Sequence, residues 1–476
     1  MERKKKRLAN VPEDLQDYKS KAKLWFGGLF APDREIYIAR APARLDVMGG
    51  IADYCGAVAL QGVLKQAAVV GIQLRRDRRL LVKSVGIEND GFRSIADYDL
   101  DRFYDTGAVK SFANIRQDLL KDPSTLWMAY VLGAYPVLLH EKIAGQFGNG
   151  ATICIKSNIP VQAGLGASSA LVMATLLAMK QAYSLAPDAF QLAKCCQQVE
   201  QQIIGVPGGI VAPLTSAMGK NGKLLVIRCQ PHELLKMITL PADIQFIGIN
   251  SRIKPANDHN HYIDSRTAAL LGRKILIARL QEQGVANPFN GYLCNLAAEH
   301  WQERYQNLLP EQMTGRKFLD QYAGHDDEMT EIELKKTYHV QNCAAFPVYE
   351  NARVQKFIKK LETYTQTGNR TILAEAGELM YESHAAYSEL VNLGTNETDI
   401  LVSLVKKLGP ENGLYGARVS GNGGGGTVVV LTAKNNEDTI RNITSQYYDQ
   451  TGFKPDIFTE SSPGGLELGA ETIKFT

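Results

Sequence analysis

The sequence predicts a protein of two domains that each combine strands with helices, an α/β or α+β architecture. Its 476 residues, 45% of them hydrophobic, are more than a single core usually holds. Strand-like alternation over 35–40, followed by β-rich stretches at 67–74 and 80–85, indicates a sheet in the first third of the chain. A strand pattern at 151–156 leads into a Gly-rich turn and a helical pattern, which is typical of a strand–loop–helix unit.

The remaining elements follow from the same patterns. They are, in order, helices at 170–184 and 188–204, strands at 223–228 and 243–250, helices at 266–283 and 354–363, and a strand, glycine loop and strand over 414–431. The second helix stops at the turn Gly205 to Gly209, and we expect the domain change soon after it. We therefore divide the chain into an N-terminal extension (1–30), a first domain (31–220) and a second domain (221–476).

Charge and hydropathy exclude several classes of function. With 53 basic and 50 acidic residues, the net charge of +3 gives no broad positive field for nucleic acid. No stretch approaches the roughly 20 apolar residues of a membrane span, and the basic run at 1–7 lacks the apolar segment of a secretory signal. Seven scattered cysteines without metal-binding spacing fit a reducing compartment. We expect a cytoplasmic monomer or homodimer with neither nucleic acid nor membrane as partner.

The segment Pro160–Ala170 has the composition of a phosphate-binding loop. Glycine lets the backbone approach an anion that a Cβ would keep away, and the N-terminus of the following helix favours negative charge. Serine hydroxyls suit a phosphate oxygen or Mg²⁺. The nucleotide-binding candidates are Gly164, Leu165, Gly166, Ala167, Ser168 and Ser169. A purely structural connector between strand and helix is the alternative.

The pattern P-x-x-x-G-L-G-x-S-S in this loop resembles the phosphate loop of the GHMP kinases, among them galactokinase, mevalonate kinase and homoserine kinase. Two further segments match in the expected order: 40–54, which contains R-L-D-V-M-G-G-I-A-D-Y, and the glycine loop at 421–427. The first of them is most similar to the kinase domain of L-arabinokinases. The resemblance implies a two-domain GHMP fold, in which a mixed-sheet domain carries the phosphate loop and an α/β sandwich follows.

The resemblance also implies roles for individual residues, with ATP and Mg²⁺ as cofactors. Ser168 and Glu200 match the family's magnesium ligands, and Arg44 matches the arginine beside the transferring phosphate. Asp46, Asp53 and Tyr262 are the substrate-binding candidates, and Gly421, Gly423 and Gly424 complete the phosphate site. Several have a structural alternative: a buried helix-end carboxylate for Glu200, a surface ion pair for Arg44, packing around the turn for Asp46, and tight-turn glycines for the last three.

The sequence departs from the family at the general base. Galactokinases and arabinokinases carry an aspartate and a glutamine where this chain has Ala212 and Pro213. A general base typically raises the reaction rate by about 10²–10⁴-fold, whereas positioning and electrostatics do most of the work of phosphoryl transfer. Loss of the base therefore does not exclude the reaction. Asp46 and Asp53 are the nearest carboxylates that could replace it, and the histidines at 259 and 261 are a further option. The sequence alone does not choose among them.

The pattern as a whole predicts an ATP- and Mg²⁺-dependent sugar kinase that binds a small-molecule sugar and a nucleotide. The expected substrate is a galacto-configured monosaccharide, phosphorylated at its anomeric hydroxyl. Gly50 lies where galactokinases carry a glutamate directed at the sugar's C6 hydroxyl, which favours a pentose such as L-arabinose. Ala212 keeps two alternatives open: a catalytically disabled sensor of nucleotide or sugar, and a GHMP-fold enzyme that acts on another polyol.

Overall fold

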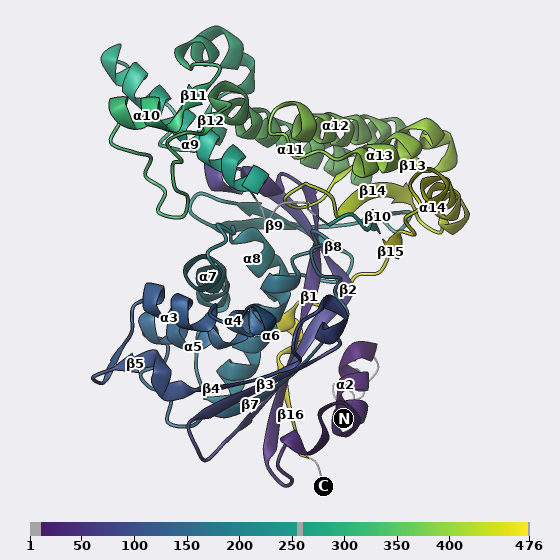
Figure 1. The fold of residues 1–476 in the computed structure, drawn as a ribbon. Helices are drawn as coiled ribbons and strands as arrows, with labels where there is room; N and C mark the ends of the chain where they lie inside the picture. The colour runs from purple at the N-terminus through teal and green to yellow at the C-terminus, as the bar shows by residue number, and fades with distance from the viewer. Residues whose placement is uncertain (1–10, 255–259, 475–476) are drawn as a thin grey trace.

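Two β-sheets, one in each half of the molecule, organise the fold in the computed structural model, which describes residues 11–254 and 260–474. The long antiparallel strands β1 (Glu35–Met48) and β2 (Val58–Leu74) run from one half toward the other (Figure 1). The sequence pattern revealed only part of each strand, because Pro42 and Arg44 interrupt the alternation of β1. Register shifts between Pro42 and Arg44, and again between Asp46 and Met48, accommodate these residues.

The first sheet has eight strands in the order β16-β1-β2-β7-β3-β4, with β8 paired to β2 and β9 to β8. Its other strands are β3 (Arg79–Val85), β4 (Ile95–Asp99), β7 (Ala151–Ser157), β8 (Lys223–Arg228), β9 (Glu233–Thr239) and β16 (Ala470–Lys474). Strands β8 and β9, which follow the expected boundary at 220, pair within the first sheet. The C-terminal strand β16 also returns to pair with β1.

Helices cover both faces of this sheet (Figure 1). On one face lie α3 (Phe112–Leu119), α4 (Met128–Leu132), α5 (Ala134–His140), α6 (Ala167–Ala182), α7 (Ala189–Gln198) and α8 (Val211–Met218). Helix α2 (Glu13–Phe26) packs on the other face, where the Tyr18 hydroxyl donates a 2.8 Å hydrogen bond to the carbonyl of Cys154. The side chains of Leu15, Tyr18 and Phe26 are buried, so α2, which lies within the expected N-terminal extension, packs on the first sheet.

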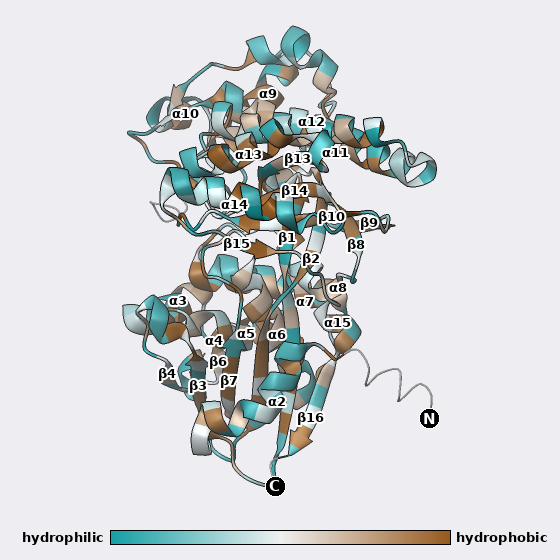
Figure 2. Cartoon of the chain, turned by 90° about the vertical axis from the view of Figure 1, so that its right-hand side faces the viewer, coloured by the Kyte–Doolittle hydropathy of each residue, from teal (hydrophilic) through white to brown (hydrophobic). Residues whose placement is uncertain are grey.

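The second sheet has four strands in the order β13-β14-β10-β15. They are β10 (Ile244–Asn250), β13 (Leu414–Val419), β14 (Thr427–Ala433) and β15 (Asp456–Phe458). Helices α12 (Arg370–Glu389) and α13 (Asn396–Leu408) pack on it. Helix α11 (Val340–Thr367) packs on α12, α9 (Asn260–Glu282) on α11, and α14 (Glu437–Thr451) on α13. In Figure 2 the strands are largely hydrophobic, whereas the outer helices α2 and α14 carry many hydrophilic residues. This distribution is expected of sheets buried between helical layers.

Shorter elements connect these layers. They are the strand pairs β5 (Tyr104–Asp105) with β6 (Ala108–Val109) and β11 (Met313–Thr314) with β12 (Thr337–Tyr338), and the helices α10 (Gly315–Gln321) and α15 (Gly465–Leu468). Within 11–254 and 260–474, no helix combines the length and apolar composition that a membrane crossing needs.

Candidate active site

The predicted phosphate loop joins β7 to the N-terminus of α6. Gly164 (φ +72°) and Gly166 (φ +69°) both adopt the left-handed conformation that favours glycine. Helix α6 begins at Ala167, directly after Gly166, and runs for 16 residues. The N–H groups in the first turn of α6, which have no partner within the helix, therefore lie directly after the loop. This is the arrangement found at helix N-termini that bind anions.

The second glycine loop packs directly on the first. A Cβ at Gly421 would lie 2.8 Å from the carbonyl oxygen of Gly164, and one at Gly426 would lie 2.8 Å from that of Ala163. The Thr427 hydroxyl donates a 2.8 Å hydrogen bond to the same Ala163 oxygen. The glycines are therefore needed for the close approach of two loops that come from the two sheets.

The N–H groups of the second loop are engaged more than the sequence suggested. The N–H of Gly421 donates to Asp46 Oδ2 at 3.2 Å, and that of Gly424 donates to the Leu393 carbonyl at 2.8 Å. A Cβ at Gly423 would lie 2.5 Å from the same Leu393 oxygen. The amides of Gly421 and Gly424 thus fix the shape of the loop, and the phosphate-binding role of these two residues stays a prediction.

Arg44 lies where the two loops meet. Its Nη1 donates a 2.8 Å hydrogen bond to the Gly164 carbonyl, and a Cβ at Gly421 would be 3.3 Å from the same nitrogen. Its Nε is buried and has no hydrogen-bond partner among the described residues. The side chain also packs beside Gly166, where a Cβ would lie 3.1 Å from Arg44 Cγ. A guanidinium with unused donors therefore lies next to the start of α6.

Glu200 and Ser168, the two predicted metal ligands, lie together with Ser169. The hydroxyls of Ser168 and Ser169 donate to Glu200 Oε1 at 2.6 and 3.0 Å. Burial raises the pKa of Glu200, while the serine hydrogen bonds and the charge of Arg44 lower it. Among the described residues, no three His, Cys, Asp or Glu side chains gather closely enough to hold a metal unaided. One carboxylate and one hydroxyl fit Mg²⁺, which usually keeps several waters and shares substrate phosphates.

Asp46 is enclosed in a network that joins the two halves of the molecule. Its carboxylate accepts hydrogen bonds from Gln61 Nε2 at 2.7 Å, Arg418 Nη1 at 3.3 Å and the N–H of Gly421. Both Asp46 and Arg418 have side chains with no exposed surface. A Cβ at Gly50 would lie 2.1 Å from Asp46 Oδ2, so glycine is required there. These contacts favour packing around the turn over the substrate-binding role expected for Asp46.

Asp53 differs from Asp46 because one of its oxygens is unused. Its carboxylate lies against the turn before α8, where a Cβ at Gly209 would be 1.6 Å from Oδ2. Oδ1 is closed to solvent and has no hydrogen-bond partner among the described residues. Burial raises the pKa of Asp53 to about 6, against the lowering effect of Arg266 and, more weakly, Arg44.

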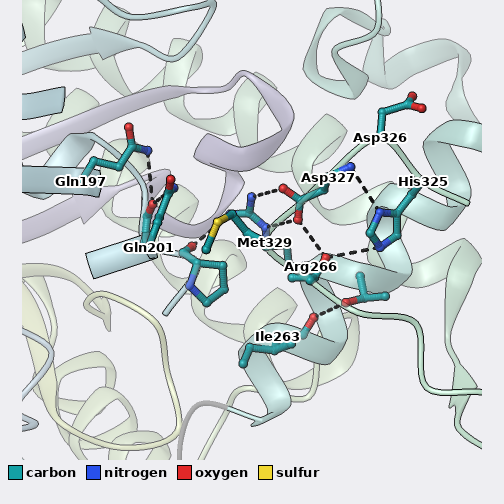
Figure 3. A network of polar contacts seen from close by, with 12 residues as sticks. Gln197, Gln201, Ile263, Arg266, His325, Asp326, Asp327 and Met329 are labelled. Carbon is teal, nitrogen blue, oxygen red and sulfur yellow. Dashed lines mark hydrogen bonds and ion pairs between the residues drawn. The ribbon is translucent and has the colours of Figure 1, made fainter. Parts of the chain in front are cut away.

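The turn 205–209 is held by donors from both halves of the molecule (Figure 3). Tyr262 Oη and Arg266 Nη1 donate to the Pro207 carbonyl at 3.3 and 3.0 Å, and Gln197 and Gln201 donate to the Gly208 carbonyl. Arg266 is itself fixed by a bidentate pair with Asp327, at 3.2 and 3.0 Å. Tyr262 is buried, and its hydrogen bond to Pro207 places it at the same turn that borders Asp53.

Ala212 lies in the first turn of α8, and its methyl faces the phosphate loop. A Cβ at Gly166 would be 3.5 Å from that methyl and 3.1 Å from Arg44 Cγ. The residue without a carboxylate is therefore beside the loop and the arginine. Of the two histidines considered in its place, residue 259 lies outside the described residues and His261 is exposed.

Sequence reasoning missed the side chains that organise this site from the second half of the chain. Arg418 precedes the glycine loop by three residues, and Asp327 lies in a segment without regular structure. An arginine within an apolar strand pattern shortly before a glycine loop was the available signal for the first. No local pattern marks the second, because its partner Arg266 is 61 residues away.

Comparisons with known proteins agree with this arrangement. The protein family described as "GHMP kinases N terminal domain" matches residues 129–220, which include the phosphate loop and Glu200. The family described as "GHMP kinases C terminal" matches residues 370–450, which include the second glycine loop. The chain carries the two domains of the GHMP kinase family. Its two-domain fold, with a mixed sheet and flanking helices, is the fold that the sequence predicted.

Similar proteins include kinases whose names give different substrates. An L-arabinokinase of Arabidopsis thaliana is 34% identical over 94% of this chain, which spans about half, 48%, of that relative's length. The structure of Lactococcus lactis galactokinase complexed with galactose matches with a TM-score of 0.73 and 20% identity, over 96% of this chain and 100% of that one. A Methanococcus jannaschii mevalonate kinase matches with a TM-score of 0.53 and 17% identity, over 89% and 98%. The two structural matches establish a shared fold.

Proposed function

We propose that this GHMP-family chain is an ATP- and Mg²⁺-dependent sugar kinase, which transfers the γ-phosphoryl group to the anomeric hydroxyl of a galacto-configured monosaccharide, with L-arabinose as the leading candidate. The observation that carries the proposal is the meeting of the two glycine loops at Arg44. It combines a phosphate-binding helix start, a partly unused guanidinium and a buried carboxylate with two hydroxyls in one place.

The nucleotide phosphates would lie at the N-terminus of α6. Gly164 and Gly166 let the backbone approach them, and the N–H groups of Ala167, Ser168 and Ser169 together with the helix dipole favour their charge. Ser168 and Glu200 would hold Mg²⁺, which supplies charge neutralisation on the phosphates when bound. Release of the serine hydrogen bonds to Glu200 would free the carboxylate for that role.

The sugar would bind beside the turn 205–209, next to Asp53. Asp53 offers an unused carboxylate oxygen to a hydroxyl group, and Tyr262 borders the same turn. The preference for a pentose rests on similarity to the arabinokinase, because Gly50 is also required by the carboxylate of Asp46. A side chain that reaches the sugar from residue 50 would need Asp46 to move.

The transfer itself needs alignment and charge stabilisation more than covalent chemistry. The anomeric oxygen forms a bond to the γ-phosphorus while the bond from that phosphorus to the β–γ bridging oxygen breaks, and ADP leaves. Arg44, anchored on the Gly164 carbonyl, supplies a fixed positive charge where negative charge develops. The seven free, buried cysteines support a reducing location such as the cytoplasm.

A second candidate function is favoured by Ala212. A chain that binds ATP and a sugar without turnover would act as a sensor, and the missing carboxylate beside Arg44 is the observation in its favour. It predicts sugar and nucleotide binding in calorimetry with no ADP released.

A sugar series tests the proposed function. ADP release would be measured with L-arabinose, D-fucose and D-galactose, which share one ring configuration and carry no substituent, a methyl or a hydroxymethyl at C5. We expect turnover to be greatest with L-arabinose and to be absent with its methyl glycoside, which has no free anomeric hydroxyl. Turnover that is equal with the methyl glycoside would overturn the proposed position of transfer.

A further inference from the structure

The proposed reaction lacks a proton acceptor at residue 212. The hydroxyl that attacks the γ-phosphorus must lose its proton, and Ala212 offers only a methyl group beside Arg44 and the phosphate loop. Any replacement has to be a carboxylate or another base that approaches the phosphate loop and Arg44 from a different element.

Two of the three candidate carboxylates already have other partners. Asp46 accepts from Gln61, Arg418 and the Gly421 amide, and its side chain has no exposed surface. Glu200 accepts from two serine hydroxyls and is the candidate metal ligand. A carboxylate that serves as a metal ligand cannot also take up the proton without losing its charge.

The third candidate carboxylate is Asp53. Asp53 lies against Gly209, three residues before Ala212 on the segment that leads into α8. Its Oδ1 is closed to solvent without a partner among the described residues, an arrangement that is costly unless a ligand supplies a donor. We propose that Asp53 accepts the proton of the attacking sugar hydroxyl, in place of the carboxylate missing at residue 212; this inference rests on the proposed function.

The charges around Asp53 fit this role. Arg266 on α9 and Arg44 on β1 favour its ionised form, whereas burial and the neighbouring Asp46 oppose it. Tyr262 and the cysteines at 55, 229 and 294 face the same carboxylate, and burial raises the pKa of each, so they remain neutral near neutral pH. With a pKa of about 6, Asp53 is mostly ionised near neutral pH and still basic enough to take up a proton.

The step balances without a further reactant. The anomeric oxygen bonds to the γ-phosphorus, its proton moves to Asp53 Oδ1, and the β–γ bridging oxygen leaves with ADP. Release of the proton to water after the products depart restores the carboxylate. No oxidation or reduction is involved.

Asp53→Asn, which keeps the shape and removes the basic oxygen, tests the assignment in the full chain. Turnover of ATP with L-arabinose would be compared with that of the wild type and of Asp101→Asn, a control at an exposed carboxylate of the first domain. We expect kcat to fall by about 10²–10⁴-fold in Asp53→Asn alone, with ATP affinity unchanged in calorimetry. The sugar Kd, measured with a non-hydrolysable ATP analogue, should change by less than about tenfold.

Two results would overturn the inference. One is a kcat within about threefold of the wild type, and the other is a sugar Kd weakened about 100-fold with kcat retained at saturating sugar, which is the signature of a sugar-holding residue only. A wild-type chain that binds ATP but phosphorylates no sugar in the series would instead overturn the proposed function, and this inference with it.

Two further measurements keep the inference testable if Asp53→Asn does not fold. In the wild type, kcat/KM should fall about tenfold per pH unit below about pH 6, because the base must be deprotonated. A flat profile from about pH 5 to 8 contradicts the assignment.

In Ala212→Asp, a second carboxylate adds negative charge near the γ-phosphate although Asp53 already serves as the base. Turnover of this variant should therefore be unchanged or lower than that of the wild type. A rise of about tenfold or more would show that the wild type lacks a base.

Discussion

Asp46 and Arg418 form an ion pair, 3.3 Å between Oδ2 and Nη1, in which neither side chain has any exposed surface. The pair joins strand β1 of the first sheet to strand β13 of the second, and the same carboxylate receives the Gly421 amide. It therefore fixes the second glycine loop against the first. Its role is positional, since its oxygens are engaged by the protein.

Removal of this carboxylate's charge should destabilise the chain. Asp46→Asn leaves Arg418 buried without its counter-ion, and breaking such a pair typically costs about 3–5 kcal/mol. Urea unfolding would measure the loss. The control is Asp97→Asn, which removes an exposed pair with Arg79 and should cost at most about 1 kcal/mol. Equal effects of the two substitutions would contradict the buried-network interpretation.

Asp53→Asn should have the opposite effect on stability. The pKa of Asp53 is about 6 when folded against 3.8 for the ordinary group, so the folded chain holds the proton more tightly. Stability is therefore lost as the pH rises from about 4 through about 6, by up to about 3 kcal/mol. We expect Asp53→Asn to melt at a higher temperature than the wild type at about pH 7.5, with the gain shrinking toward about pH 4. A melting temperature lowered equally at both pH values would argue against a buried carboxylate whose pKa is raised by the fold.

Glu200→Gln tests the metal role with little change of shape. Burial raises the pKa of Glu200, so replacement by a neutral side chain should not destabilise the fold near neutral pH. The Mg²⁺ concentration for half-maximal turnover should rise by at least about tenfold. Glu411→Gln, at an exposed position, is the matched control. A loss of melting temperature that parallels the loss of turnover would favour a purely structural glutamate.

Gly166→Val tests the phosphate loop. The new Cβ would lie 3.1 Å from Arg44 Cγ at a left-handed residue with φ of +69°, so both strain and crowding are expected. We expect ATP affinity in calorimetry to fall by at least about tenfold. Gly452→Val has a similar φ of +74° with open space around it, so it isolates the strain. Unchanged ATP affinity in Gly166→Val, or an equal loss in both variants, would be evidence against the loop.

The local elements were predictable because their signals are local. The strand–loop–helix unit around Gly164, strand β8 and the strand–loop–strand unit of β13 and β14 all follow patterns within a few residues. The full lengths of β1 and β2 were not predictable, since Pro42 and Arg44 break the alternation and pairing partners decide the structure there. The packing of α2 and the return of β16 likewise depend on residues at opposite ends of the chain.

The candidate site was predictable in its residue types and less so in their roles. Asp46 and Asp53 are close in sequence, yet their surroundings differ because Arg418 comes from 372 residues beyond Asp46, whereas Asp53 packs on the glycine at 209. From the sequence, both were candidates to replace the general base, and nothing local indicated which of the two is available. In the second loop, five glycines indicated a phosphate site, but the engagement of their amides by Asp46 and Leu393 is a tertiary property.

The most direct test of the account follows the phosphorus atoms themselves. In ³¹P NMR of the wild-type chain with ATP, Mg²⁺ and L-arabinose, we predict that the γ-phosphate signal is replaced by equal amounts of ADP and a sugar 1-phosphate. The product should be absent without Mg²⁺ and in Arg44→Met, which removes the guanidinium on the Gly164 carbonyl. ATP that stays intact with every galacto-configured sugar, while calorimetry shows it bound, would contradict the sugar-kinase assignment and favour a sensor.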